Sequence, residues 1–126
     1  MGATESYTET FVELIRRAST ELPPDVLEAL EEGRKVEQAE GLATIALDTI
    51  LNNVELARES SAPICQDTGT PVFWINHPAG VSPRGLKKDF TAAVREETSR
   101  KYLRTNAVET LTGSNNGDVA GRGIPL

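Results

Sequence analysis

The residues best suited to chemistry lie in one segment, 63–71, which reads Pro-Ile-Cys-Gln-Asp-Thr-Gly-Thr-Pro. It contains the only cysteine of the chain, Cys65, followed at once by the amide of Gln66 and the carboxylate of Asp67. The glycine and proline that follow cannot continue a helix, because glycine frees the backbone and proline removes a hydrogen-bond donor. Such a loop can present the three side chains toward one point. A soft thiolate beside hydrogen-bonding and proton-transfer groups favours a metal-assisted site over a packing site.

Length and composition are those of one soluble globular domain or part of one. The chain has 126 residues, of which 38% are hydrophobic and 25% are charged. No apolar run is long enough to span a membrane, and the first ten residues are polar and acidic, so a cytoplasmic protein is expected. A single cysteine excludes an internal disulfide framework.

The net charge of −6 is spread unevenly along the chain. Residues 1–60 carry 13 acidic and 5 basic side chains, a net −8, whereas residues 61–126 carry 6 acidic and 8 basic ones, a net +2. The acidic half disfavours nucleic acid and anionic membranes as partners. The half that contains Cys65 is the one able to attract a small anion.

Three helices are predicted in the first sixty residues, where apolar residues recur at helical spacing. The first begins near Glu5, the second spans about 25–36, and the third spans about 42–58. The third helix is apolar on two sides, which predicts that it is buried between neighbours. Its central Asn52-Asn53 pair is unfavourable in an isolated helix, so we expect packing or polar contacts there.

Downstream of the cysteine, residues 71–78 read as a short β-type run that places Phe73 and Trp74 in the core on opposite faces. Ser82 followed by a proline then predicts the start of a fourth helix, about 83–103. The end of the chain, 124–126, is typical of the start of a strand. The expected fold class is α+β and predominantly helical: a helical N-terminal layer, a Cys-bearing loop, a short strand and a helix. The core stripe of the fourth helix consists of Leu86, Phe90, Ala93 and Val94.

Segment 63–71 resembles the signature of the class I, iron–sulfur-dependent fumarate and tartrate hydro-lyases, in the N-terminal part of their catalytic alpha region. The three acidic helices upstream of it are similar to the opening of that family. Further similarity lies in Tyr-Leu-Arg at 102–104, Leu-Thr-Gly at 111–113, Asn-Asn-Gly-Asp at 115–118 and Ile-Pro at 124–125. The resemblance therefore covers nearly all of residues 1–126, which we interpret as a partial alpha-region domain, an N-terminal fragment.

The resemblance implies a 4Fe–4S cluster held by three cysteines, with one iron open to substrate, and Cys65 matches the first of these ligands. It also implies that Gln66 and Asp67 contact a small dicarboxylate, with Asp67 a candidate for proton transfer. Arg104 matches a position that pairs with a substrate carboxylate. The chemistry agrees, because clusters require thiolates and a guanidinium is the best bidentate partner for a carboxylate. A beta subunit or C-terminal beta region and an oligomeric complete enzyme are also implied.

The sequence departs from the family pattern at two places, Thr105 and 119–122. The first, where proline is expected, leaves Arg104 less rigidly presented, and the second alters a turn that can shape the substrate pocket. A larger departure is the lack of two further cysteines, which must lie outside this chain if a cluster forms. We therefore expect the isolated fragment to be inactive.

Other interpretations remain open from the sequence alone. Within the hydro-lyases, the signature serves tartrate dehydration as well as fumarate hydration. The motif can also be a relic in a non-catalytic interaction module, or Cys65 can act alone as a redox-sensing thiol. For individual residues, Asp67 can hydrogen-bond its own turn, and Arg104 can complement the dipole at a helix C-terminus. His77 is interpreted as a strand-end residue rather than a metal ligand.

Overall fold

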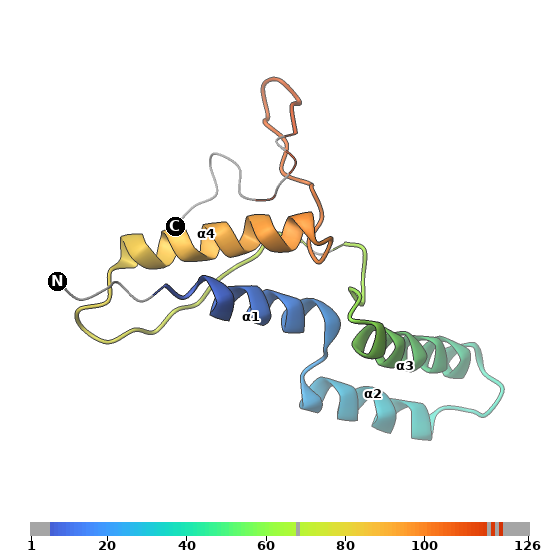
Figure 1. Cartoon of the computed structure of the whole chain (residues 1–126). Helices are drawn as coiled ribbons and strands as arrows, with labels where there is room; N and C mark the ends of the chain where they lie inside the picture. The colour runs from blue at the N-terminus through green and yellow to red at the C-terminus, as the bar shows by residue number, and fades with distance from the viewer. Residues whose placement is uncertain (1–5, 68, 116, 118, 120–126) are drawn as a thin grey trace.

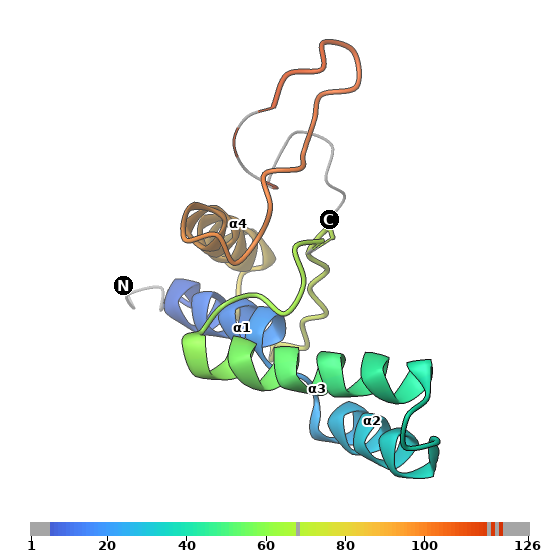
Figure 2. The same cartoon turned by 90° about the vertical axis from the view of Figure 1, so that its right-hand side faces the viewer.

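The computed structural model describes residues 6–67, 69–115, 117 and 119. Its helices are α1 (Thr8–Thr20), α2 (Pro24–Val36), α3 (Leu42–Ser60) and α4 (Pro83–Ser99). Helix α1 packs against α4 and runs in the same direction, whereas α2 and α3 form an antiparallel hairpin on the side of α1 away from α4 (Figures 1 and 2). The predominantly helical character expected from the sequence is confirmed.

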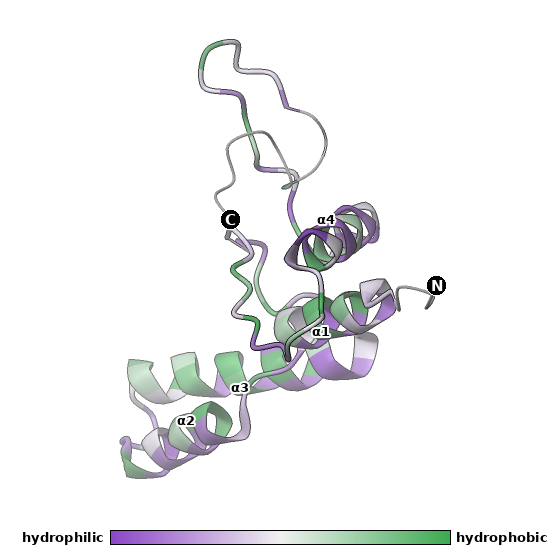
Figure 3. Cartoon of the chain, turned by 90° about the vertical axis from the view of Figure 1, so that its left-hand side faces the viewer, coloured by the Kyte–Doolittle hydropathy of each residue, from purple (hydrophilic) through white to green (hydrophobic). Residues whose placement is uncertain are grey.

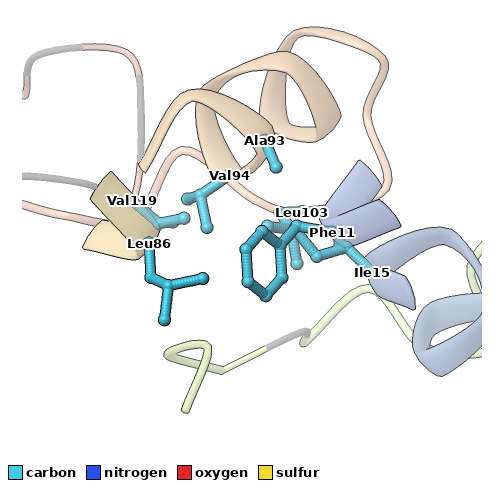
Figure 4. Close-up of a cluster of buried hydrophobic side chains, with 7 residues drawn as sticks. All are labelled: Phe11, Ile15, Leu86, Ala93, Val94, Leu103 and Val119. Atoms are coloured by element: carbon cyan, nitrogen blue, oxygen red, sulfur yellow. The ribbon is translucent and has the colours of Figure 1, made fainter. Parts of the chain in front are cut away.

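The core lies between α1 and α4, where the two amphipathic helices meet. Figure 4 shows the side chain of Phe11, on α1, lying among apolar side chains of α4. The predicted stripe of α4 is confirmed, with Phe90 at its partly buried margin. Seven buried residues form the cluster: Phe11, Ile15, Leu86, Ala93, Val94, Leu103 and Val119.

The beginnings of α1 and α4 are stabilised in different ways. Ser82 caps α4, because its hydroxyl oxygen accepts a hydrogen bond from the backbone of Gly85 at 3.2 Å, as the sequence predicted. Helix α1 begins at Thr8 rather than near Glu5, and it lacks a local side-chain cap. Instead, Asp89 of α4 accepts the backbone N–H of Tyr7 at 2.8 Å. This carboxylate also complements the positive end of the α1 dipole.

An aromatic trio fixes the connection between α3 and α4 onto the α1–α4 pair. Phe73 stacks on Phe90 with ring centroids 5.0 Å apart, and its ring meets Phe11 edge to face at 5.6 Å. Both geometries suit the quadrupoles of the rings and add to the burial of their area. The segment that contains Phe73 therefore belongs to the α1–α4 core, although it is not helical.

The strand predicted at 71–78 does not form within the described residues, and the α+β class is not confirmed. The segment has no ladder partner, and among the described residues the β pairing is limited to one antiparallel bridge between Val108 and Asn115. A strand is defined by hydrogen bonds to a neighbour, so alternating side chains alone do not produce one. Trp74 was expected in the core but is 97% exposed. The predicted strand start at 124–126 lies outside the described residues.

Helix α3 is less buried than its sequence predicted. It packs on α2, and the guanidinium of Arg34 binds the carboxylate of Asp48 across the pair, with one contact at 3.1 Å. Helix α3 also contacts α1, but several of its apolar residues stay exposed, so the expected burial of both apolar sides is wrong here. The exposed apolar residues of α3 are Leu42, Ile45, Ile50 and Leu56.

A residue in the left-handed conformation follows the last turn of each of the helices α3 and α4. Helix α4 ends at Ser99 rather than near residue 103, because Lys101 adopts a left-handed conformation with φ of 69°. The N–H of Tyr102 then donates to the carbonyl of Glu97 at 2.9 Å, which closes a Schellman turn. Ser61, with φ of 49°, closes α3 in the same way.

No helix among the described residues is long and apolar enough to cross a membrane.

Replacing Lys101 with glycine is expected to increase the free energy of unfolding by about 0.5–1 kcal/mol, because glycine adopts the left-handed conformation without a steric penalty from Cβ. Urea denaturation followed by circular dichroism measures the change. The matched control is Lys87→Gly, within α4, which we expect to destabilise by about 1 kcal/mol. Equal losses in both variants would contradict this account of the helix end.

Candidate functional site

Ile64, the residue before Cys65, forms hydrogen bonds through both its backbone N–H and its carbonyl group. The backbone N–H of Ile64 donates to the carbonyl of Ser19, in α1, at 2.9 Å. The carbonyl of Ile64 accepts the side-chain amide of Asn53, in α3, at 2.9 Å. These two contacts fix the backbone immediately before Cys65 relative to two helices. They also give Asn53 the polar role that the sequence left open.

The three motif residues Cys65, Gln66 and Asp67 follow this anchor in the connection between α3 and α4, and all three are exposed. The backbone N–H of Asp67 lies 3.4 Å from the sulfur of Cys65 and donates to it. Gly69 has a φ of 63°, so the chain turns there as its glycine predicted. Convergence of the three side chains on one point stays a prediction.

Arg104 lies just after the Schellman turn of α4. Leu103 is buried in the core cluster, which fixes the chain at the residue before Arg104, and the arginine itself is exposed. The alternative that Arg104 complements the dipole of α4 loses its basis, because the helix ends five residues earlier at Ser99. The structure therefore places Arg104 as an exposed residue beyond the end of α4.

One hydrogen bond connects the two segments that carry the candidate residues. The hydroxyl groups of Ser61 and Tyr102 lie 2.9 Å apart, and Arg16 of α1 reaches the Ser61 hydroxyl at 3.5 Å. Ser61 precedes Cys65 by four residues, and Tyr102 precedes Arg104 by two. The contact thus brings the starts of both segments together at the C-terminal ends of α3 and α4. No sequence pattern predicts it, because it joins residues 41 positions apart.

Glu97 is a buried carboxyl that the sequence analysis missed. It lies on the inner side of α4 beside Val94, has no exposed surface, and accepts a hydrogen bond from Arg100 at 3.2 Å through Oε1. Its Oε2 atom has no hydrogen-bond partner among the described residues. Burial raises the pKa of this carboxyl, and Arg100 offsets the shift only in part. Its position three residues after Val94, on the apolar stripe, was the available sequence signal.

Replacing Glu97 with glutamine is expected to raise the free energy of unfolding near pH 7 by about 1 kcal/mol, because a neutral amide costs less to bury than a carboxylate whose Oε2 has no hydrogen-bond partner among the described residues. The pKa of Glu97 in the folded protein lies above its ordinary value of 4.5. Protonated Glu97 therefore favours the native protein fully below pH 4.5. This contribution to the free energy of unfolding is lost as the pH rises through the raised pKa. The difference between variant and wild type therefore grows with pH above 4.5 and then levels off.

Urea denaturation at a series of pH values measures this difference. Glu96→Gln is the matched control, since Glu96 is the preceding residue of α4 and its side chain is 41% exposed. We expect that control to stay within about 0.5 kcal/mol of wild type. A Glu97→Gln effect that is constant with pH would contradict a raised carboxyl pKa.

The donor set of the described residues fits a metal centre only in part. Cys65 offers an exposed thiol of the kind that iron–sulfur clusters require. Within the described ranges, however, no group of three or more His, Cys, Asp and Glu side chains is placed to hold a metal ion. His77 is exposed, and its Nδ1 lies 3.1 Å from the carbonyl of Pro78. The described residues can therefore contribute one cluster ligand, and no complete site.

Comparison with known proteins identifies the family. Residues 8–126 match the family described as Fumarate hydratase (Fumerase), and the chain belongs to it. A putative fumarate hydratase class I of Geobacillus stearothermophilus is 39% identical over 122 residues, which are 97% of this chain and 24% of that protein. A putative L(+)-tartrate dehydratase subunit alpha of Methanocaldococcus jannaschii is 34% identical over 111 residues, 86% of this chain and 39% of that protein. The L(+)-tartrate dehydratase subunit alpha of Escherichia coli K12 is 31% identical over 124 residues, 98% of this chain and 41% of that protein.

These matches confirm the resemblance to fumarate and tartrate hydro-lyases on which the sequence analysis relied. They also set its extent. The chain spans about a quarter of the fumarate hydratase and about two fifths of the tartrate dehydratase alpha subunits that it matches.

Proposed function

We propose that this chain forms part of an iron–sulfur hydro-lyase that adds water reversibly across the double bond of a small dicarboxylate, most simply fumarate to malate. The observation that carries the proposal is the family match over residues 8–126, which includes an exposed Cys65 on a backbone held by two helices. A ligand position that must meet a cluster has to be both accessible and fixed. Cys65 satisfies both requirements.

Cys65 is proposed as one ligand of a 4Fe–4S cluster whose other two cysteine ligands lie outside this chain. The chain contains a single cysteine, so its own residues do not complete the ligand set. When bound, the cluster supplies a Lewis-acidic iron that activates the substrate hydroxyl. The backbone N–H of Asp67 donates to the sulfur of Cys65 at 3.4 Å, which orients the side chain within its loop.

The remaining candidate residues bind and orient the substrate. Arg104 can hold one carboxylate through two parallel N–H donors. The amide of Gln66 orients the dicarboxylate by hydrogen bonds, and the carboxylate of Asp67 accepts or returns the proton at the carbon next to a substrate carboxylate. All three side chains are exposed, and the Ser61–Tyr102 hydrogen bond brings their two segments to the same ends of α3 and α4.

The complete enzyme is proposed to include polypeptide beyond this chain. Two of the relatives are named as alpha subunits, which implies a beta subunit or a corresponding C-terminal beta region as partner. We further propose a cytoplasmic location and an oligomeric assembly, with no nucleic acid or membrane as partner. The acidic N-terminal half is consistent with this absence.

Tartrate dehydration is the second candidate, because two of the three relatives described above carry that name. The two reactions differ in whether the substrate carries a second hydroxyl, and no described residue of this chain distinguishes them. A relic interaction module and a thiol sensor remain as alternatives outside the hydro-lyases. Each predicts that Cys65 takes up no cluster even in a complete assembly.

The test is anaerobic iron–sulfur reconstitution of this chain alone and of a chimera in which it replaces the matching segment of the Geobacillus protein. We expect visible cluster absorption in the chimera, none in the isolated chain, and turnover of fumarate in preference to tartrate. Cys65→Ser in the chimera is expected to abolish cluster absorption, whereas Ser99→Ala, an exposed control, is not. A folded chimera that takes up no iron would falsify the hydro-lyase proposal, and turnover of tartrate alone would favour the second candidate.

A further inference from the structure

The segment 71–76 combines one partly buried and one exposed apolar side. Phe73 and Ile75 pack against the core cluster between α1 and α4. The alternate residues Val72 and Trp74 are 88% and 97% exposed. This period of two is that of a β-strand with one face covered by helices. The connection between α3 and α4 that contains it includes strongly hydrophobic stretches in Figure 3.

The backbone of the same segment makes no hydrogen bond to any other residue that the structure describes. Among the described residues, no backbone hydrogen bond involves residues 71–76, although the residues before and after them are bonded through Ile64 and Val81. Unpaired N–H and C=O groups of an extended apolar segment form a template for a neighbouring strand. The exposed side chains of Val72 and Trp74, and a backbone without hydrogen bonds to other described residues, both point to a neighbouring strand.

The sequence does not protect this segment as proteins protect a solvent-exposed strand. Edge strands usually carry lysine or other charged side chains that prevent further pairing. From residue 68 to residue 83 this chain has no Lys, Arg, Asp or Glu. A continuous apolar run such as Val-Phe-Trp-Ile is typical of a strand covered on both faces.

We propose that residues 71–76 are an interior strand of a sheet, paired and covered by polypeptide that corresponds to the part of the related alpha subunits that this chain does not span. That part amounts to about three fifths of the M. jannaschii and E. coli alpha subunits, since this chain spans 39% and 41% of them. It is large enough to supply both neighbouring strands and a layer over Val72 and Trp74. A second copy of this chain fits less well, because pairing of two edges leaves the face with Trp74 open. The inference rests on family membership, not on the proposed reaction.

The experiment is hydrogen–deuterium exchange at residues 72–76 in this chain alone and in a complex with the complementary part of the M. jannaschii alpha subunit, co-expressed as a separate polypeptide. We expect a 1:1 complex and exchange at these amides at least about tenfold slower than in the chain alone. Trp74 is the only tryptophan, so fluorescence of the isolated chain verifies that it starts exposed. Neither readout depends on iron or on turnover.

Matched substitutions locate the contact. Val72→Asp is expected to weaken the complex at least about tenfold, because it places a charge on the covered face. Val36→Asp is the control, since Val36 is 82% exposed at the end of α2, and it is expected to leave affinity unchanged. Where no complex forms in separate chains, a covalent chimera of the two parts is measured in the same way. The proposal is overturned by unprotected amides in both arrangements, by equal effects of the two substitutions, or by protection that arises from self-association of this chain.

Discussion

In a hydro-lyase assembled with this chain, Arg104→Met is expected to lower kcat/KM for the dicarboxylate by about 10²–10³-fold or more. The estimate follows from losing two charge-assisted hydrogen bonds of about 1.5–3 kcal/mol each, at about 1.4 kcal/mol per factor of ten. The arginine follows a buried anchor, Leu103, and is itself exposed, so its replacement leaves the residues of the core cluster unchanged. Steady-state kinetics of the Geobacillus chimera measure the loss.

Two further variants separate binding by Arg104 from a general effect of charge. Arg104→Lys keeps the positive charge but loses the planar fork, so we expect an intermediate loss. Arg84→Met, at the exposed start of α4, removes an arginine of the same chain and should leave kcat/KM unchanged. Iron content, read by visible absorption, is expected to be the same in all three. Equal losses from Arg104→Met and Arg84→Met would contradict a carboxylate contact at Arg104.

The local parts of the fold could be predicted from the sequence because they depend on short-range spacing. The stripe of α4, its Ser82 cap and the turn at Gly69 all follow from residues within a few positions of one another. The end of α4 could not be predicted in this way, because Lys101 adopts a left-handed conformation that lysine seldom takes. The side chain gave no sign of it.

The errors arise where the outcome depends on residues far apart in the sequence. Segment 71–78 has the alternation of a strand, but a strand also needs a neighbour, and Trp74 needs a layer to cover it. Several apolar residues of α3 are likewise exposed. For the candidate site, the motif identified Cys65, while the contacts that hold its segment were invisible in the sequence. Those contacts come from Ser19, Asn53 and Tyr102.

Replacing Phe11 with alanine is expected to lower the free energy of unfolding by about 3–5 kcal/mol, the range for a large aromatic removed from a packed core. Phe11 is 7% exposed and meets Phe73 and Phe90 edge to face, at 5.6 Å and 6.1 Å. The substitution therefore leaves a cavity and removes both ring contacts. Since whole domains are stable by only about 5–15 kcal/mol, this one change is expected to populate the unfolded chain without denaturant.

The measurement must follow the helices, because Trp74 is already 97% exposed in the folded chain and its emission will change little on unfolding. Far-ultraviolet circular dichroism during urea denaturation is suitable. Leu14→Ala is the matched control: Leu14 lies on the same helix and is 50% exposed, so its loss is expected to cost less than about 1 kcal/mol. If Phe11→Ala costs no more than Leu14→Ala, the α1–α4 interface is not the principal core. The fixed backbone that we propose for Cys65, which depends on α1 through Ser19, would then lose its support.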